Sequence, residues 1–497
     1  MRRSVSGLLV AMMCAGCAVG PDYVTPETNL PEKFMGADGQ PLQGQPALEK
    51  WWSNFSDPIL TQLVSEAVRN NNDLQSAIAR VNQSRALYNQ TFLNLFPTIT
   101  ADGQYTNTHI PTSTFAGGAI KTGKNHIDND YFSTGFDAVW EIDIFGRVRR
   151  GVEAQDAQLD ASVAGLQDGV RILVSEVARN YMQLRGAQQQ KNVSQENART
   201  QEQVVKVAQA LFKGGQSTEF DVVRARAQYS NTLATIPPLE AQEKTAIYRL
   251  GVLTGRQPQE LVNLLTPTNP LPSYTGPVTL GDPAALLKRR PDIRALERQL
   301  AAATANIGVA EGDLFPKVTF NGSISLQAPS VPELTSGSND AWNLIPTISW
   351  PAFNLGRVIA QMNQAEAIAD EQVARYEQSI LIALEETEGA LAQFAAARQR
   401  RDYLRVSVDQ SSKAVSIART QYENGLIDLL PVLDAQRVAL LAQLELVGSE
   451  TNVLTSLVQL FKALGGGWDE ALGTSDVIDV IDETGHVPAV VTTPIPS

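Results

Sequence analysis

The apolar residues of this chain recur with two different periods, one typical of strands and one typical of helices. In KVTFNGSISLQ, residues 317–327, the apolar side chains of Val318, Phe320, Ile324 and Leu326 occupy alternate positions. The segment DYFSTGFDAVWEI, residues 130–142, alternates in the same way. This alternation predicts strands with one apolar face and one polar face.

A helical period follows each strand region and continues for an unusual length. Between Gly356 and Asn424 only Gly389 interrupts residues that favour helices. Apolar residues recur there at spacings typical of a coiled-coil seam: Met362, Ala365, Ala369, Val373, Tyr376, Ile380 and Ala383. A helix of about 68 residues, rising ~1.5 Å per residue, would be roughly 100 Å long. We expect such a rod to pack laterally on similar rods.

The two halves of the sequence resemble each other. LFPTITADGQY, residues 95–105, matches LFPKVTFNGSI, residues 314–324, at a separation of 219 residues. Beyond the strands the separation becomes 210 residues and stays constant, so that Trp140 matches Trp350 and Gly215 matches Gly425. A register kept over so long a segment predicts an internal two-fold repeat.

Prolines and glycines set the expected boundaries. The first copy, 59–265, is predicted to contain a helix, a β-hairpin at 97–142, a long helix at 146–213 and a return helix at 218–254. The second copy, 284–468, is predicted to contain a helix, a β-hairpin at 316–351, a long helix at 356–424 and a return helix at 428–464. The remaining parts are an extended N-terminal segment at 17–58, a linker at 266–283 and a partly disordered tail at 469–497.

The alternating strands fit two environments. A half-buried strand of a soluble sheet has this pattern, and so does a strand of a transmembrane barrel. Phe96, Trp140, Phe315 and Trp350 lie at strand ends, where they would be either core aromatics or the interfacial girdle of a barrel. Two copies supply four strands, and an open sheet in lipid would leave unpaired edges. If the strands lie in a membrane, several chains must therefore close one barrel.

Composition argues against several classes of function. The chain has 497 residues with 53 acidic and 40 basic side chains, and no basic stripe indicates a nucleic-acid partner. Both cysteines lie within the first 17 residues, so no disulfide framework is expected. His109, His126 and His486 lack metal-ligand spacing. Without a phosphate loop or a nucleophile elbow, we predict no enzymatic activity, no metal and no cofactor.

The N-terminus resembles a bacterial lipoprotein leader. Arg2 and Arg3 precede a short apolar run, residues 7–13, and small residues precede Cys17. The resemblance implies a signal peptide at 1–16 and a covalent lipid, including palmitate, on Cys17. Ala18 then favours sorting to the outer membrane. The alternative is an ordinary secretory signal with an incidental cysteine, since Cys14 stands where the motif usually has leucine.

Four further segments, CAVGPDYVTP, RRPDIRALERQL, YENGLIDLLPVLDAQR and LFKALGGGW, resemble the outer-membrane factors of tripartite efflux pumps, the TolC-like channels of the lipid-anchored multidrug and NodT type. The resemblance covers nearly the whole mature chain. It implies a membrane α+β fold: a homotrimer whose twelve-stranded transmembrane β-barrel, four strands per chain, continues into an α-helical coiled-coil barrel in the periplasm. The implied partners are the bilayer, a periplasmic adaptor and an inner-membrane pump of the RND type.

The same resemblance assigns a periplasmic gate to Leu430 and Asp434. Four residues apart on one helix face, they would form a leucine ring and a carboxylate ring in a trimer. The alternative is that Leu430 packs in the helix seam while Asp434 pairs with Arg437 on a solvated face. Pro431 and Glu423 depart from relatives that carry an acid and an arginine there, so a second carboxylate ring and a gate salt bridge do not carry over.

The turns between the long and return helices are either ordinary helix endings or tips that contact the adaptor. The residues expected at these tips are Gly214, Gly215, Ser217, Gly425, Leu426 and Asp428. We therefore expect an exit duct in the outer membrane that passively conducts drugs or other small toxic solutes from the pump and adaptor to the exterior. The alternatives are a type I protein-secretion or metal-efflux channel and, from another class, a structural coiled-coil lipoprotein of the periplasm.

Overall fold

The structure, a computed structural model, describes residues 18–28, 30–31, 33–35, 48–111, 126–276, 283–337 and 339–468. The expected signal peptide at 1–16, Cys17 and the tail at 469–497 lie outside the described residues, as do parts of the N-terminal segment and of the linker. The chain divides into two compact units. The first comprises Met1–Pro26, Asn82–Ala161 and Leu296–Tyr376, and the second comprises Glu27–Val81, Ser162–Ala295 and Glu377–Ser497.

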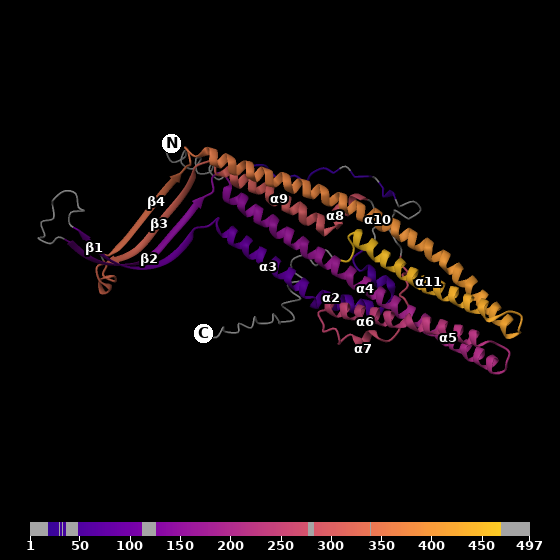
Figure 1. The fold of residues 1–497 in the computed structure, drawn as a ribbon. Helices are drawn as coiled ribbons and strands as arrows, with labels where there is room; N and C mark the ends of the chain where they lie inside the picture. The colour runs from indigo at the N-terminus through magenta and orange to yellow at the C-terminus, as the bar shows by residue number, and fades with distance from the viewer. Residues whose placement is uncertain are drawn as a thin grey trace. The chain divides into compact units, whose positions relative to one another are not determined.

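The first unit contains a four-stranded antiparallel sheet with the strand order β1-β2-β3-β4 (Figure 1). Its strands are β1 (Thr98–Pro111), β2 (His126–Ile142), β3 (Lys317–Ala328) and β4 (Asp340–Ser349). The two hairpins expected at 97–142 and 316–351 are thus joined edge to edge through β2 and β3. β1 and β4 each have one partner within the described sheet and one open edge.

One face of the sheet is apolar across all four strands. Ala101 pairs with Phe136, Phe136 with Ile324, and Ile324 with Trp342. Because directly paired residues project to the same side, the apolar positions of the separate strands form one continuous surface. That surface is uncovered: Trp342 is 76% exposed, and Phe136 and Ile324 are exposed as well.

The opposite face is polar in the same register. Thr100 pairs with Asp137, Asp137 with Ser323, and Ser323 with Asn343. A one-residue slip of any strand would mix the two faces, so the observed pairing is the one that keeps them apart. The alternation predicted for residues 130–142 and 317–327 is confirmed, although Val139 and Ile345 are apolar residues on the polar face.

Helices make up most of the rest. They are α2 (Pro58–Asn70), α3 (Asn72–Leu93), α4 (Arg147–Lys213), α5 (Glu219–Ala234), α6 (Ile236–Leu253), α7 (Val262–Leu265), α8 (Pro283–Arg289), α9 (Pro291–Gly312), α10 (Leu355–Glu423) and α11 (Leu429–Ala463), with short 3₁₀ helices η2 (Trp51–Phe55) and η4 (Val331–Glu333). The two long helices, α4 and α10, contain 67 and 69 residues without a break. None of the described helices combines the length and apolar character needed to cross a bilayer.

The return helix of the first half differs from the prediction. Instead of one helix at 218–254, the chain forms α5 and α6, which separate at Thr235. Pro237 and Pro238 follow this break. Proline has no backbone N–H to donate, and inside a helix its ring clashes with the carbonyl group of the preceding turn. The second half has Val447 and Gly448 at the corresponding positions, and α11 runs through them unbroken.

The predicted seam of α10 is the covered side of that helix. Ala369, Tyr376, Ile380 and Ala383 are all buried. Away from the seam α10 keeps large apolar side chains exposed, among them Leu381, Tyr403, Val406 and Ile417. The second long helix therefore has apolar surface that the described chain does not cover.

A buried polar network in the second unit ties the linker to α4. The Arg185 side chain, which is completely buried, donates from Nη1 to the Gln188 side chain (2.7 Å) and to the Pro267 carbonyl (2.9 Å). Gln188 in turn donates to the Leu265 carbonyl (2.8 Å) and to Glu243 (3.0 Å), and Glu243 pairs with Lys191. The linker is thus fixed by one buried cation and its hydrogen-bond partners.

We expect Arg185→Ala to lower the free energy of unfolding by about 1 to 3 kcal/mol, because it leaves buried acceptors without their donor. Urea unfolding in detergent measures this loss. Arg199→Ala is the control, since Arg199 and Glu196 form an exposed pair that should contribute less than about 1 kcal/mol. Equal effects of the two substitutions would contradict a structural role for the network.

Candidate functional site

Two helix-turn-helix ends in the second unit carry most of the predicted site residues. The α4–α5 turn and the α10–α11 turn have the same geometry: Gln216 N–H donates to the Leu211 carbonyl (2.9 Å), and Leu426 N–H donates to the Gln421 carbonyl (2.8 Å). Gly215 and Gly425 have φ of 71° and 70°, as a helix-ending motif of this kind requires. Glycine is needed there for its backbone conformation, whatever else the turns contact.

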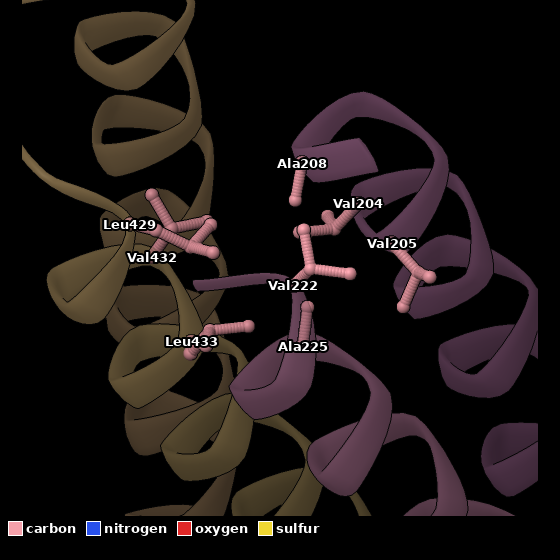
Figure 2. Close-up of a cluster of buried hydrophobic side chains, with 8 residues drawn as sticks. All are labelled: Val204, Val205, Ala208, Val222, Ala225, Leu429, Val432 and Leu433. Carbon is pink, nitrogen blue, oxygen red and sulfur yellow. The ribbon is translucent and has the colours of Figure 1, made fainter. Parts of the chain in front are cut away.

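A buried apolar cluster joins these two ends (Figure 2). Its members, which we call the hairpin cluster, are Val204, Val205 and Ala208 of α4, Val222 and Ala225 of α5, and Leu429, Val432 and Leu433 of α11. Tyr229, Ala418, Tyr422 and Ile427 pack against it. The cluster makes the two helix pairs one packed body at this end.

Leu430 and Asp434 lie outside the hairpin cluster. Leu430 is 48% exposed although its neighbour Leu429 is buried, so Leu430 does not pack in the helix seam of its own chain. The Asp434 carboxylate accepts from Arg437 (2.7 Å), and both side chains are exposed. The Asp434–Arg437 pair agrees with the alternative of an ion pair on a solvated face. The exposed Leu430 agrees with the interpretation as a gate residue.

The two return helices begin differently. The Thr218 side chain caps α5 by accepting from the Asp221 backbone N–H, and the Asp221 carboxylate accepts from Thr218 N–H (3.2 Å) and from the Ser217 hydroxyl (3.0 Å). At α11 the cap residue Asp428 makes no such side-chain hydrogen bond, and Pro431 stands where α5 has Asp221. The first turn of α5 is therefore fixed by a reciprocal cap that α11 lacks.

The charge of Asp221 affects the pKa of a neighbouring group at this end of the second unit. Burial alone would raise the pKa of Asp221, but hydrogen bonds from Thr218 and Ser217, with the nearby Arg224, outweigh burial and lower it. Burial and then the charge of Asp221 raise the pKa of Tyr422. Glu423 pairs with Arg419 on its own helix (2.8 Å).

Phe220 is a site residue that the sequence did not single out, and it lies one turn before Arg224 on α5. They occupy, 210 residues earlier, the positions of Leu430 and Asp434. Phe220 is 64% exposed, and the Arg224 guanidinium lies 5.1 Å from the centre of its ring. The repeat register could have identified Phe220, because it places an aromatic and a cation where the second half has a leucine and an acid.

The predicted rim aromatics in the first unit tie strand ends to helix ends. The Trp140 indole donates to the Leu95 carbonyl (3.0 Å), and the Trp350 indole donates to the Leu314 carbonyl (3.0 Å). Phe315 stacks on Phe145 with ring centres 4.6 Å apart, and Phe96 lies near Phe92. Phe353, which the sequence analysis did not identify, follows Trp350 by three residues and is fully exposed.

Cys17 lies outside the described residues, so its predicted lipid stays a prediction. Among the described residues, no group of three or more histidine, cysteine, aspartate or glutamate side chains is arranged to hold a metal ion.

Comparison with known proteins gives one consistent family. A model described as outer membrane efflux protein matches residues 63–256 and 283–466. A curated relative, the solvent efflux pump outer membrane protein SrpC of Pseudomonas putida, is 32% identical over 93% of this chain and 97% of its own length.

Solved structures agree with this assignment. The outer-membrane channel OprN superposes with a TM-score of 0.84 at 36% identity, covering 91% of this chain and all of the other. The open state of the Neisseria gonorrhoeae MtrE outer membrane channel superposes with a TM-score of 0.80 at 25% identity, covering 92% of this chain and all of the other.

We expect Thr218→Ala to destabilise the first turn of α5 by about 1 kcal/mol, which would speed amide exchange there roughly fivefold. Hydrogen–deuterium exchange of the peptides that contain the two helix starts measures this. Asp428→Ala is the matched control at α11, where no side-chain cap is lost, and should have the smaller effect. The reverse order would contradict the difference in capping.

Proposed function

The chain belongs to the outer membrane efflux protein family, and on that premise we propose that three copies form one continuous exit duct. The protein is an outer-membrane component of an efflux system. We infer that it acts passively, with no chemistry of its own, and that the solutes are drugs or other small toxic compounds. The name of the relative SrpC, a solvent efflux pump protein, supports this class of solute.

The open edges of the sheet are the observation that carries the proposal. β1 and β4 each have one unpaired edge, and the face shared by Phe136, Ile324 and Trp342 is apolar and uncovered. Contact between lipid and that apolar surface would be favourable, but lipid offers no hydrogen-bond partner to a strand edge. If β4 of one copy pairs with β1 of the next, three copies give a closed barrel of twelve strands with the polar face toward the lumen.

The long helices support the same assembly. The exposed apolar side chains of α10, such as Leu381 and Val406, have no cover in the described chain. Lateral packing against helices of a neighbouring copy would bury them, as in a coiled-coil barrel. The same copies that close the strands would then build the periplasmic tunnel.

We place the periplasmic gate at Leu430 and Asp434. Both are exposed on α11, four residues apart and beside the hairpin cluster that holds the helix start. Three-fold symmetry would bring three leucines together as a constriction that excludes water, next to three carboxylates that favour cations. Opening would require the Asp434–Arg437 pairs and the first turn of α11 to move away from the axis.

The remaining partners follow from the family. We propose that the α4–α5 and α10–α11 turns, with Gly214, Ser217, Leu426 and Asp428, contact a periplasmic adaptor, and that an inner-membrane pump of the RND type delivers the solute. Cys17 would carry the lipid that anchors the chain to the outer membrane. A secretion or metal-efflux channel would share this fold, but no described cluster favours either one.

We expect the purified protein to be a trimer in detergent and to conduct poorly in planar bilayers, since the gate is closed at rest. Leu430→Ala should raise the conductance severalfold because it removes the apolar ring, and Asp434→Ala should change cation selectivity. Leu441→Ala, an exposed leucine farther along α11, is the control. A monomer without conductance would reject the duct, whereas a conducting trimer unchanged by either substitution would reject only this gate.

We expect a photoreactive crosslinker placed at Ser217 or Asp428 to capture the adaptor in intact cells. Both residues lie in the helix-turn-helix ends, whereas the same probe at Arg375, on the exposed surface of α10, serves as the negative control. Capture at Arg375 but at neither turn would place the adaptor contact elsewhere.

A further inference from the structure

The segment Ala18–Thr25, which directly follows Cys17, packs against α4 and α9 of the first unit. Val19 N–H donates to the Phe145 carbonyl (3.0 Å), at the point where β2 gives way to α4. A Cβ added at Gly146 would lie 2.5 Å from the Cα of Ala18, so no other residue fits there without displacing the segment. We call Ala18–Thr25 the strap.

Arg150 of α4 grips the backbone of the strap. Its Nε donates to the Val19 carbonyl (3.0 Å), and its Nη2 donates to the Gly20 carbonyl (3.1 Å) and to the Asp22 carboxylate (2.7 Å). Only 5% of the Arg150 side chain is exposed. Its Nη1 donates to the Glu153 carboxylate (2.8 Å), which neutralises the charge of the guanidinium. A buried guanidinium that spends three donors on one short segment is a specific contact rather than a surface pairing.

Two glycines let the strap approach α9. A Cβ at Gly20 would lie 2.4 Å from the Cα of Gly308, and a Cβ at Gly308 would lie 2.8 Å from the Val19 carbonyl oxygen. Gly20 also has a φ of 91°, which favours glycine. Backbone therefore lies directly on backbone where the strap crosses α9.

The far end of the strap is fixed as well. The Tyr23 hydroxyl donates to the Glu297 carboxylate (3.1 Å), and Arg298 lies 5.4 Å from the centre of the Tyr23 ring. The ring packs on Ala157, Ala301 and Ala302, and burial raises its pKa to about 12. These contacts explain Gly20, Asp22 and Tyr23 of the segment CAVGPDYVTP, for which the duct itself gives no reason.

We propose that the strap fixes the lipid anchor at the strand-to-helix junction, with Arg150 as the positioning residue. This rests on the proposed lipid at Cys17. Consecutive Cα atoms are about 3.8 Å apart, so a held Ala18 leaves the acylated residue almost no freedom to move away from Phe145 and Gly146. A loose N-terminal segment of the same length would let the acyl chains enter the bilayer anywhere within its reach.

The geometry gives the anchor a second role. The strap contacts α4, which follows the first hairpin, and α9, which precedes the second hairpin, and so it connects the chain segments that adjoin β2 and β3. Phe145 stacks on Phe315 at the same place. Each acyl group would therefore enter the membrane at the level of the rim aromatics and hold the barrel at a fixed depth in the inner leaflet.

A photoreactive fatty acid tests this directly. Cells are fed a diazirine-bearing fatty acid, the intact protein is irradiated in membranes, and mass spectrometry measures first the lipid on Cys17 and then the crosslinked peptides. We expect crosslinks concentrated in peptides that contain Phe145 and Phe315. In Arg150→Ala these crosslinks should fall severalfold and spread over the lipid-facing strands, while Arg375→Ala, which disrupts an exposed pair with Glu371, should leave them unchanged.

The outcomes separate the two proposals. Cys17 without lipid would overturn both the proposed anchor and the strap inference. Lipidated protein whose junction crosslinks are unchanged by Arg150→Ala, or that has none, would overturn the strap inference alone. Where Arg150→Ala does not assemble, Tyr23→Ala weakens the outer part of the strap without removing the buried cation. The same shift of crosslinks in a heat-stable trimer would then support the proposal, and an unshifted pattern would reject it.

Discussion

Backbone hydrogen bonding in a medium without water governs this architecture. A strand edge exposes a row of N–H and C=O groups, and hydrocarbon cannot satisfy them. The sheet has two such edges, on β1 and β4, together with a continuous apolar face. In a single chain the apolar face would favour lipid while the open edges would exclude the sheet from it. A closed ring of chains removes this conflict, because every edge is then paired. The paired register matters as much as the composition, because only that register gathers the apolar positions of four strands on one side.

The passage from strand to helix raises the same problem locally. The carbonyls at the end of a helix need donors, and in the proposed duct the chain would pass from lipid to water at this level. The indoles of Trp140 and Trp350 donate to the carbonyls of Leu95 and Leu314, just beyond α3 and α9. A tryptophan placed there satisfies a backbone acceptor, and in the proposed barrel it would also present an apolar ring to the membrane interface. The two junctions thus contain the same indole-to-carbonyl hydrogen bond, from tryptophans that are 210 residues apart.

The sequence allowed the periodic parts of the structure to be predicted and little of what joins them. Strands and long helices repeat one choice many times, so a local window contains the signal. The helix predicted from the sequence runs across Thr235, although Pro237 and Pro238 supply a local signal for the break that the second half, with Val447 and Gly448, lacks. The grip of Arg150 on the strap joins residues 128 or more positions apart, and no local pattern encodes such a contact. Phe220 is exposed and contacts only Arg224 of its own helix among the contacts described above, so the repeat register is the sequence signal that relates it to Leu430.

The two hairpin ends show how a near-symmetrical chain can hold one helix firmly and another weakly. Both turns close with the same glycine motif, and both return helices share the hairpin cluster. They differ in the first helical turn, where Thr218 and Asp221 satisfy each other's backbone N–H groups and Asp428 and Pro431 do not. A side-chain cap contributes about 1 kcal/mol, and a symmetrical assembly multiplies this difference by its number of copies. Leu430 belongs to the uncapped turn, so the residue that we propose for the constriction lies where the start of the helix lacks a side-chain cap, while Leu429 and Val432 keep the turn attached to the cluster. Local weakness beside a firm anchor lets a constriction move without unfolding the helix that bears it.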